Sequence, residues 1–228
     1  ANTLTGMYES GIDTSNAKPF SLIKVADYVS SQSVQSRVET TVHYPFFLEP
    51  IIFNEIIQEV ALEEQKTFLL EGQQAEVQGE MFNGWTLDSS YQIYYASETV
   101  LSLLNTRFSY TGGAHPNTDF SVINFQLEGK LKALNLKDFF PETSLAQLIR
   151  YLSDELKDQD AAWIVDESVL LNEELLSLFT FSDLGLNFYF PPYAVGPYVQ
   201  GPFEVLVSLD TLDNLGLENN LFNILQNP

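Results

Sequence analysis

The chain has 228 residues, no cysteine, and 31 acidic against 10 basic residues, which gives a formal net charge of −21. The missing cysteines exclude disulfides, thiolate zinc ligands and thiol nucleophiles. A field this negative repels nucleic-acid backbones and anionic lipid, and it attracts basic proteins. The sequence therefore predicts no nucleic-acid partner. Either the acids only keep the protein in solution, or they recognise a cationic partner.

The beginning of the chain is polar and rich in turn-forming residues, which predicts a flexible leader over residues 1–19. No stretch approaches the ~20 consecutive apolar residues that a transmembrane helix needs. The sequence opens at Ala1 without an initiator Met and without a signal peptide. This leaves room for an export segment or lipid anchor that was removed upstream.

The next elements alternate between strand and helix patterns. Residues 34–44 alternate polar and apolar side chains and predict a half-buried strand that ends before Pro45. Residues 50–70 change to a helical period. Three further strands are predicted, the last two of them flanking a Gly-Gly loop: residues 85–95, 100–110 and 119–127.

The second half begins with a hairpin turn at Glu128-Gly129, leading into a strand over residues 130–136. Thr143 and Ser144 offer caps for a helix that runs to Leu156. The remaining predicted elements are a less regular helix at 167–178, strands at 185–190 and 203–208, and a short helix at 221–225. Strand groups separated by helices, with hairpin-like connections, predict an α+β fold of two lobes, with mostly antiparallel sheets packed against helices.

Two segments carry distinctive motifs. The first runs Tyr110-Thr111-Gly112-Gly113-Ala114-His115 and continues with Asn124–Lys130 and Leu134–Phe140. The second is the Pro- and Tyr-rich segment Phe188–Val205. Together they resemble the paired domains of unknown function of RsiV-type lysozyme-sensing anti-sigma factors and of the N-terminal region of PdaC-type peptidoglycan deacetylases. Gln126 stands where the family pattern has an acid, and Phe139 where it has Leu.

The resemblance covers about residues 20–210 and implies a PdaC-N-like α+β domain over 20–128 and an RsiV-like α+β domain over 129–228. It implies an extracytoplasmic protein, whether periplasmic, secreted or lipid-anchored, that recognises a ligand. In the anti-sigma branch this ligand is lysozyme, a basic protein. The catalytic domain of the deacetylases, with its metal-binding His and Asp motif, has no counterpart in this sequence, so the resemblance transfers no catalytic residue.

Two loops are the candidate ligand-binding region. The loop between the final strands is stiffened by prolines and carries tyrosines, which are enriched in interface hot spots. Gly112 and Gly113 permit φ > 0 and a tight turn, and His115 either bonds its own loop or acts with the nearby Asp119 as a base or metal ligand. The predicted binding residues are Pro191, Tyr193, Tyr198, Tyr110, Gly112, Gly113 and His115.

The leading functional hypothesis is an extracytoplasmic binding module, monomeric, for a basic protein such as lysozyme or for a peptidoglycan-related ligand. Its alternatives are a cell-wall carbohydrate-binding accessory domain, a cell-envelope enzyme, and a purely structural lipoprotein domain. No catalytic residue, cofactor or metal site is predicted, since the chain has only two histidines. The acid-rich residues 154–167 lack the glycine and closing glutamate of an EF-hand loop, so a solvated helix face is the preferred interpretation over a calcium site.

Overall fold

The computed structural model describes residues 3–8, 18–23, 25–49, 51–79, 84–128, 130–216 and 220–226. Strand β1 (Thr3–Tyr8) pairs with strand β2 (Lys18–Ile23) in a separate antiparallel sheet. Of the leader predicted at 1–19, residues 1, 2 and 9–17 lie outside the described residues, and so does Gly129 of the predicted turn.

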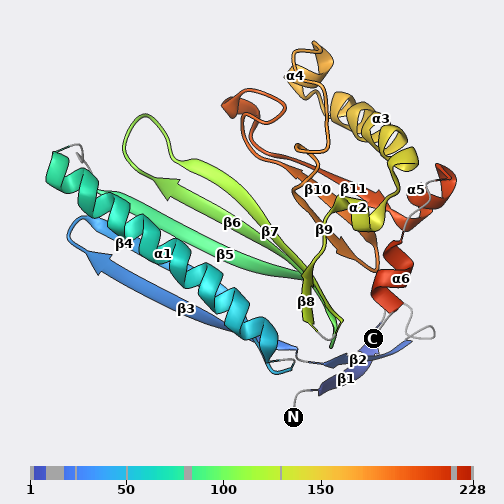
Figure 1. Ribbon diagram of the computed structural model, residues 1–228, viewed down its shortest axis with the longest axis horizontal. Helices are drawn as coiled ribbons and strands as arrows, with labels where there is room; N and C mark the ends of the chain where they lie inside the picture. Colours follow the sequence, from blue (N-terminus) through green and yellow to red (C-terminus); the bar gives the residue numbers. More distant parts are fainter. Residues whose placement is uncertain are drawn as a thin grey trace.

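A mixed sheet of six strands forms the larger layer of the molecule (Figure 1). Its strands, in spatial order, are β3 (Ala26–Gln35), β4 (Val38–Phe47), β5 (Trp85–Ala96), β6 (Val100–Tyr110), β7 (Asn117–Glu128) and β8 (Lys130–Ala133). All neighbouring strands are antiparallel except β4 and β5, which run parallel. A parallel pair needs a crossover connection, and the long helix α1 (Ile52–Gln78) supplies it.

Helix α1 covers one face of this sheet. Its buried side includes Phe53, Ile57 and Phe68, which pack with residues such as Val38 and Val42 of β4. The helix approaches the sheet most closely at Gly72, where a Cβ atom would lie 2.5 Å from Cγ2 of Val38. The sequence placed the end of this helix near residue 70. It continues for two more turns, to a C-cap at Gly79 with φ of 75°.

A smaller antiparallel sheet, of spatial order β11-β10-β9, lies on the other side of the large sheet (Figure 1). It consists of β9 (Phe179–Ser182), β10 (Gly185–Phe190) and β11 (Phe203–Ser208). Five helices accompany it: α2 (Leu136–Phe139), α3 (Glu142–Asp158), α4 (Ala162–Val165), α5 (Leu209–Asn214) and α6 (Leu221–Gln226). The largest hydrophobic cluster gathers leucines of α3 with phenylalanines of this sheet.

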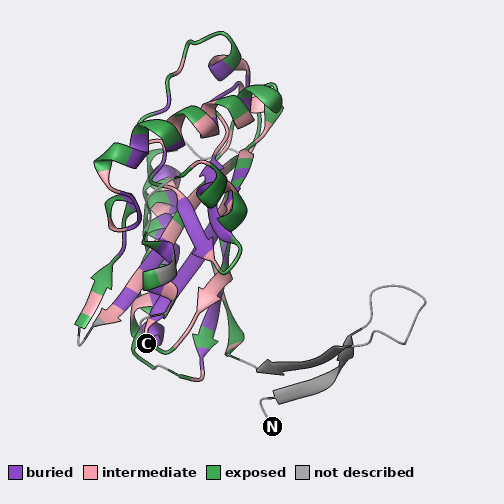
Figure 2. Cartoon of the chain, turned by 90° about the vertical axis from the view of Figure 1, so that its right-hand side faces the viewer, coloured by how far each residue is buried: buried purple, intermediate pink, exposed green. Residues whose placement is uncertain are grey.

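The two layers meet through alternate residues of β6. Leu101 and Leu103 join the cluster beneath α1, whereas Ser102 points to the opposite face and accepts a hydrogen bond from the backbone N of Phe181 at 3.0 Å. In Figure 2 the strands where the two sheets face each other carry the longest buried stretches of the chain. The α+β prediction is confirmed, and the sheets share an interface.

Several predicted elements agree with the structure and others do not. Strands predicted at 100–110, 185–190 and 203–208 have the bounds of β6, β10 and β11. The single strand predicted at 34–44 is wrong, because the chain reverses at Ser36, where φ is 59°, and β4 runs on through Pro45 to Phe47.

Three further predictions need correction. Residues 167–178 form turns and short loops instead of a helix, and the helical turn of this region, α4, precedes them. The residue that caps α3 is Pro141, so Thr143 and Ser144 lie inside the helix. The strand predicted at 130–136 ends at Ala133, since Asn135 caps α2 with its side chain. Among the described helices, none has the length and apolar character to cross a bilayer.

Candidate functional site

The β6–β7 loop is held by bonds within its own residues. Gly112 and Gly113 have φ values of 97° and 98°, as the predicted tight connection requires. The Tyr110 hydroxyl donates to the carbonyl of Gly113 at 3.2 Å, and Nδ1 of His115 lies 2.9 Å from the carbonyl of Pro116. The predicted pairing of His115 with its own loop is therefore present.

Asp119 does not complete an acid–base pair with this histidine. Its Oδ2 lies 3.4 Å from Nη1 of Arg107. Elsewhere in the described part of the chain, no group of three or more His, Asp or Glu side chains is arranged to hold a metal ion.

The β10–β11 loop is fastened to the segment around α4. Gln200 accepts from the backbone N of Ala162 at 3.1 Å and donates to the carbonyl of Asp160 at 2.7 Å. At the start of the loop, Pro191 accepts from the backbone N of Ala194 at 3.0 Å. Tyr193 lies within this turn with φ of 71°, a conformation that only a well-determined turn imposes on an aromatic residue. The loop is therefore held by hydrogen bonds at its start and at Gln200.

The two loops contact each other through His115 and Tyr198. Their rings stack with centroids 3.8 Å apart and an angle of 20° between planes. The Tyr198 hydroxyl also donates to the carbonyl of Pro116 at 2.8 Å. Tyr193 packs beside Tyr198, at 5.7 Å between ring centroids, and 53% of its surface is exposed. The structure thus brings three of the seven predicted binding residues together in one aromatic platform, which we define as His115, Tyr193 and Tyr198. Tyr110, Gly112, Gly113 and Pro191 lie in the same two loops but are not part of the ring contacts.

Acidic residues occur in the segment to which the β10–β11 loop is fastened. Asp160 and the exposed Asp166 and Glu167 belong to the segment around α4, to which Gln200 fastens the loop. Hydrogen bonds from the side chain and backbone N of Ser168 hold the pKa of the Asp166 carboxyl below its ordinary value. This carboxyl therefore stays ionised over the whole neutral range.

A second polar cluster, missed in the sequence, lies beneath α1. Oε2 of Glu64 accepts from the Ser89 hydroxyl at 2.8 Å, and its Oε1 lies 3.3 Å from Nε of Arg107. The pKa of Tyr91 is raised well above its ordinary value. The main cause is burial of the hydroxyl, and the negative charge of Glu64 and a hydrogen bond to Glu64 add to it. Ser89 and Asn105 are buried at inward-facing positions of their strands. Polar residues at such positions were the sequence signal that could have revealed this cluster. The cluster borders an open groove of about 520 Å³ that runs along α1 and is closed on the sheet side by Arg107 of β6.

Comparison with known protein families assigns both halves of the chain. Residues 28–118 match the family model of the deacetylase PdaC, and residues 137–210 match the model described as a protein of unknown function, DUF3298. The two matches follow one another along the chain. The resemblance to this domain pair is therefore confirmed. Neither match is to a catalytic domain, and PdaC-like domains are associated with the cell envelope.

Solved structures show the same fold. A DUF3298 family protein from Pseudomonas aeruginosa PAO1 superposes with a TM-score of 0.56 at 15% identity, over 84% of this chain and 93% of the other. A DUF3298 family member from Bacteroides fragilis NCTC 9343 gives a TM-score of 0.50 at 16% identity, over 88% and 97% of the two chains. No curated protein sequence matches the chain.

The platform draws on both family segments. His115 lies in the PdaC segment, whereas Tyr193 and Tyr198 lie in the DUF3298 segment. The stacked rings of His115 and Tyr198 therefore join the two. The motifs predicted each loop, but they did not predict this contact.

Proposed function

We propose that this chain is an extracytoplasmic binding module without catalytic activity, and that its aromatic platform contacts a basic protein of the lysozyme kind. The observation that carries the proposal is the stack of His115 on Tyr198 beside the exposed Tyr193. Two separate loops converge there and are cross-bonded before any ligand arrives. A rigid surface loses little entropy on binding, and exposed tyrosine is enriched in interface hot spots.

The charge of the protein supports a cationic partner. Its net charge of −21 gives a field that accelerates encounter with basic proteins and disfavours acidic ones. Asp160, Asp166 and Glu167 add negative charge to the segment around α4, to which Gln200 fastens the loop of Tyr193 and Tyr198. The match to an envelope-associated domain family supports a location outside the cytoplasm.

Hen lysozyme is a suitable first probe, with binding measured by calorimetry at low ionic strength. We expect Tyr193→Ala to weaken binding about tenfold, or ~1.4 kcal/mol, while the melting temperature stays within a degree or so. Tyr28→Ala is the matched control, because Tyr28 is also exposed, at 55%, but lies on β3. Pro191→Ala should weaken binding less, by loosening the loop.

Two results would contradict the proposal. One is the absence of saturable binding to lysozyme and to other basic proteins of similar size. The other is an equal loss of affinity in Tyr193→Ala and Tyr28→Ala, since that would mean that the platform has no special part in binding.

Carbohydrate binding is the second candidate function, because the exposed face of Tyr193 could stack on a sugar ring. Ionic strength separates the two candidates. Stacking on a neutral sugar is insensitive to salt, whereas attraction between opposite charges is screened by it.

A further inference from the structure

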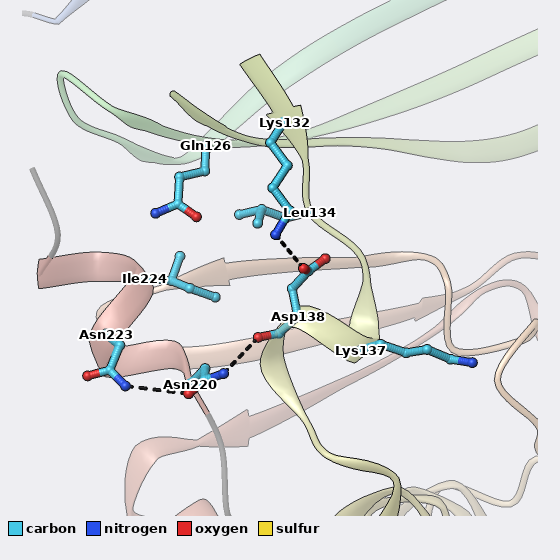
Figure 3. Close-up of a pocket in the computed structure, with 8 residues that line it drawn as sticks. All are labelled: Gln126, Lys132, Leu134, Lys137, Asp138, Asn220, Asn223 and Ile224. Atoms are coloured by element: carbon cyan, nitrogen blue, oxygen red, sulfur yellow. Dashed lines mark hydrogen bonds and ion pairs between the residues drawn. The ribbon is translucent and has the colours of Figure 1, made fainter. Parts of the chain in front are cut away.

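A second candidate site lies at the end of the molecule away from the aromatic platform. It is a pocket of about 360 Å³ between the β7–β8 hairpin, α2 and α6 (Figure 3). This volume falls in the lower range of small-molecule sites. The pocket joins two stretches that are distant in the sequence, residues 126–138 and 220–224, and neither loop of the platform contributes to it.

Hydrogen bonds among its lining residues hold the pocket in shape. Nζ of Lys132 lies 2.6 Å from Oδ1 of Asp138, and Nδ2 of Asn220 donates to the carbonyl of Asp138 at 3.2 Å. Nδ2 of Asn223 in turn donates to Oδ1 of Asn220 at 3.4 Å. Figure 3 shows these dashed contacts closing one wall of the pocket, while Lys137 points away from them.

Gln126 also lines the pocket but takes no part in these hydrogen bonds. It is only 6% exposed, and its amide has no hydrogen-bond partner among the described residues. Figure 3 shows this amide turned into the pocket. The amide atoms of Gln126 still touch solvent. Among the described side chains, Oδ1 of Asn187 is the only polar atom that is both fully enclosed and without a hydrogen-bond partner. A nearly buried amide without a partner is unfavourable unless something binds it.

The contrast with Asn124 shows that this is a local feature. Asn124 lies two residues earlier on the same face of β7 and is buried to a similar degree. Its Oδ1 accepts from Ser102 at 2.7 Å and its Nδ2 donates to Phe179 at 2.8 Å. An amide side chain on this face can therefore form hydrogen bonds with both its oxygen and its nitrogen. The amide of Gln126, which borders the pocket, forms neither with the residues that the structure describes.

The free amide defines the chemistry of a ligand. A glutamine side chain offers both a donor and an acceptor, and an amide group carries one of each in return. A secondary amide is trans, so its C=O and N–H point in opposite directions, and only one of them can meet Gln126 while the other faces water or Asn223, which also lines the pocket. Leu134 and Ile224, which line the same pocket, offer an apolar surface for a small acyl substituent. We propose that this pocket binds a small ligand through a secondary amide, such as an acetamido group, whose C=O accepts a hydrogen bond from Nε2 of Gln126.

Titrations followed by ¹H–¹⁵N NMR test this inference. The probes are N-acetylglucosamine and N-acetylglycine amide, with glucose and glycine amide as counterparts that lack the acyl group. We expect saturable shifts of the side-chain amide signals of Gln126 and Asn223 with at least one acylated probe. The counterparts should bind at least tenfold more weakly.

Substitutions at Gln126 test whether its side-chain amide forms the hydrogen bond with the ligand. Gln126→Leu keeps the apolar volume but cannot form hydrogen bonds, so it should weaken binding at least tenfold. Gln74→Leu makes the same chemical change at an exposed position of α1 and should have no effect. Gln126→Glu, which keeps the shape and removes the N–H donors, should also bind more weakly, and it serves if the Leu variant does not fold.

The outcomes separate the sources of the ligand and can overturn the inference. Stronger binding of N-acetylglucosamine indicates an acetamido sugar, and stronger binding of N-acetylglycine amide indicates a peptide-like ligand. The inference is wrong if neither acylated probe saturates, if the counterparts bind equally well, or if the Gln126 variants keep full affinity. Because the pocket is separate from the platform, Tyr193→Ala should leave these titrations unchanged.

Discussion

Asn124 on β7 donates a hydrogen bond from its Nδ2 to the carbonyl oxygen of Phe179 on β9, at 2.8 Å. Ser102 on β6 accepts from the backbone N of Phe181 at 3.0 Å, and its own hydroxyl donates to Oδ1 of Asn124. The backbone of β9, an edge strand of the small sheet, is thus satisfied by side chains from the face of the large sheet. This explains why the Asn of the sequence motif stands at a position that is buried and yet polar.

Replacing Asn124 should therefore destabilise the whole molecule. Asn124→Leu leaves the buried carbonyl of Phe179 and the hydroxyl of Ser102 without their partner, at a cost of about 2 kcal/mol in the free energy of unfolding. Urea denaturation measures this change. Asn214→Leu, at an exposed position of α5, is the control and should change stability by less than about 0.5 kcal/mol. Equal effects of the two variants would show that the hydrogen bonds to β9 contribute nothing.

The Gly-Gly loop gives a second test. Gly113 has φ of 98° with no atom within 4 Å of a Cβ placed there, so any penalty for a side chain comes from the backbone alone. Gly113→Val should cost about 1–3 kcal/mol in a thermal or urea melt, because a β-branched residue resists this conformation. Ala114→Val, at the next position and without a positive φ, should be nearly neutral. A neutral Gly113→Val would refute the structural role of this glycine.

Alkaline pH should weaken the cluster beneath α1. Burial and Glu64 raise the pKa of Tyr91 above its ordinary value of about 10, so the folded state resists loss of this proton more than the unfolded state does. Stability from this group is complete below pH ~10 and is lost as the pH rises beyond it. Tyr91→Phe should cost ~1 kcal/mol at pH 7 and show a shallower decline above pH 10. Tyr28→Phe should keep the wild-type pH profile; an unchanged profile in Tyr91→Phe would contradict the assignment.

Salt should control the encounter with a protein partner. Attraction between a chain of charge −21 and a basic protein is screened as the Debye length shortens, from about 30 Å at 0.01 M to about 8 Å at 0.15 M. We expect the association rate constant for lysozyme to fall several-fold over this range in stopped-flow measurements, and the dissociation rate constant to change little. A salt-independent association rate, or tight binding to an acidic partner, would contradict the electrostatic part of the proposed function.

The sequence predicts best those elements that are bounded by clear turn residues. Strand β6 and the strands around the Pro-rich loop have such boundaries, and their predicted ends agree with the structure. The reversal at Ser36 has none, since the alternation of Val34, Ser36 and Val38 continues through the turn. No glycine or asparagine marks the positive φ that Ser36 adopts.

The failed helix at 167–178 shows how local polar groups override apolar spacing. Asp166 and Asn172 accept hydrogen bonds from the backbone N of Ser168 and Leu175, respectively, which offers the chain an alternative to the helix. Leu171 and Leu176 still reach the core, but from turns. Strand β9 was missed because four residues are too few for a periodic signal.

The candidate site was predicted in its parts and not in its assembly. Both loops follow from their glycines, prolines and tyrosines, whereas the stack of His115 on Tyr198 joins residues 83 positions apart in the chain. The pocket at Gln126 combines segments as distant as β7 and α6. Contacts of this kind depend on the tertiary arrangement, on which periodicity carries no information.

The last helix has a consequence for how the protein is made. Leu221 and Ile224 of α6 belong to the same hydrophobic cluster as Val100 and Phe139. The backbone N of Asn220 donates to the carbonyl of Phe139 at 2.8 Å, which fixes the helix against α2. A nascent chain cannot complete this core until residue 224 has left the ribosome. Truncation before α6 should therefore leave part of this core exposed to solvent.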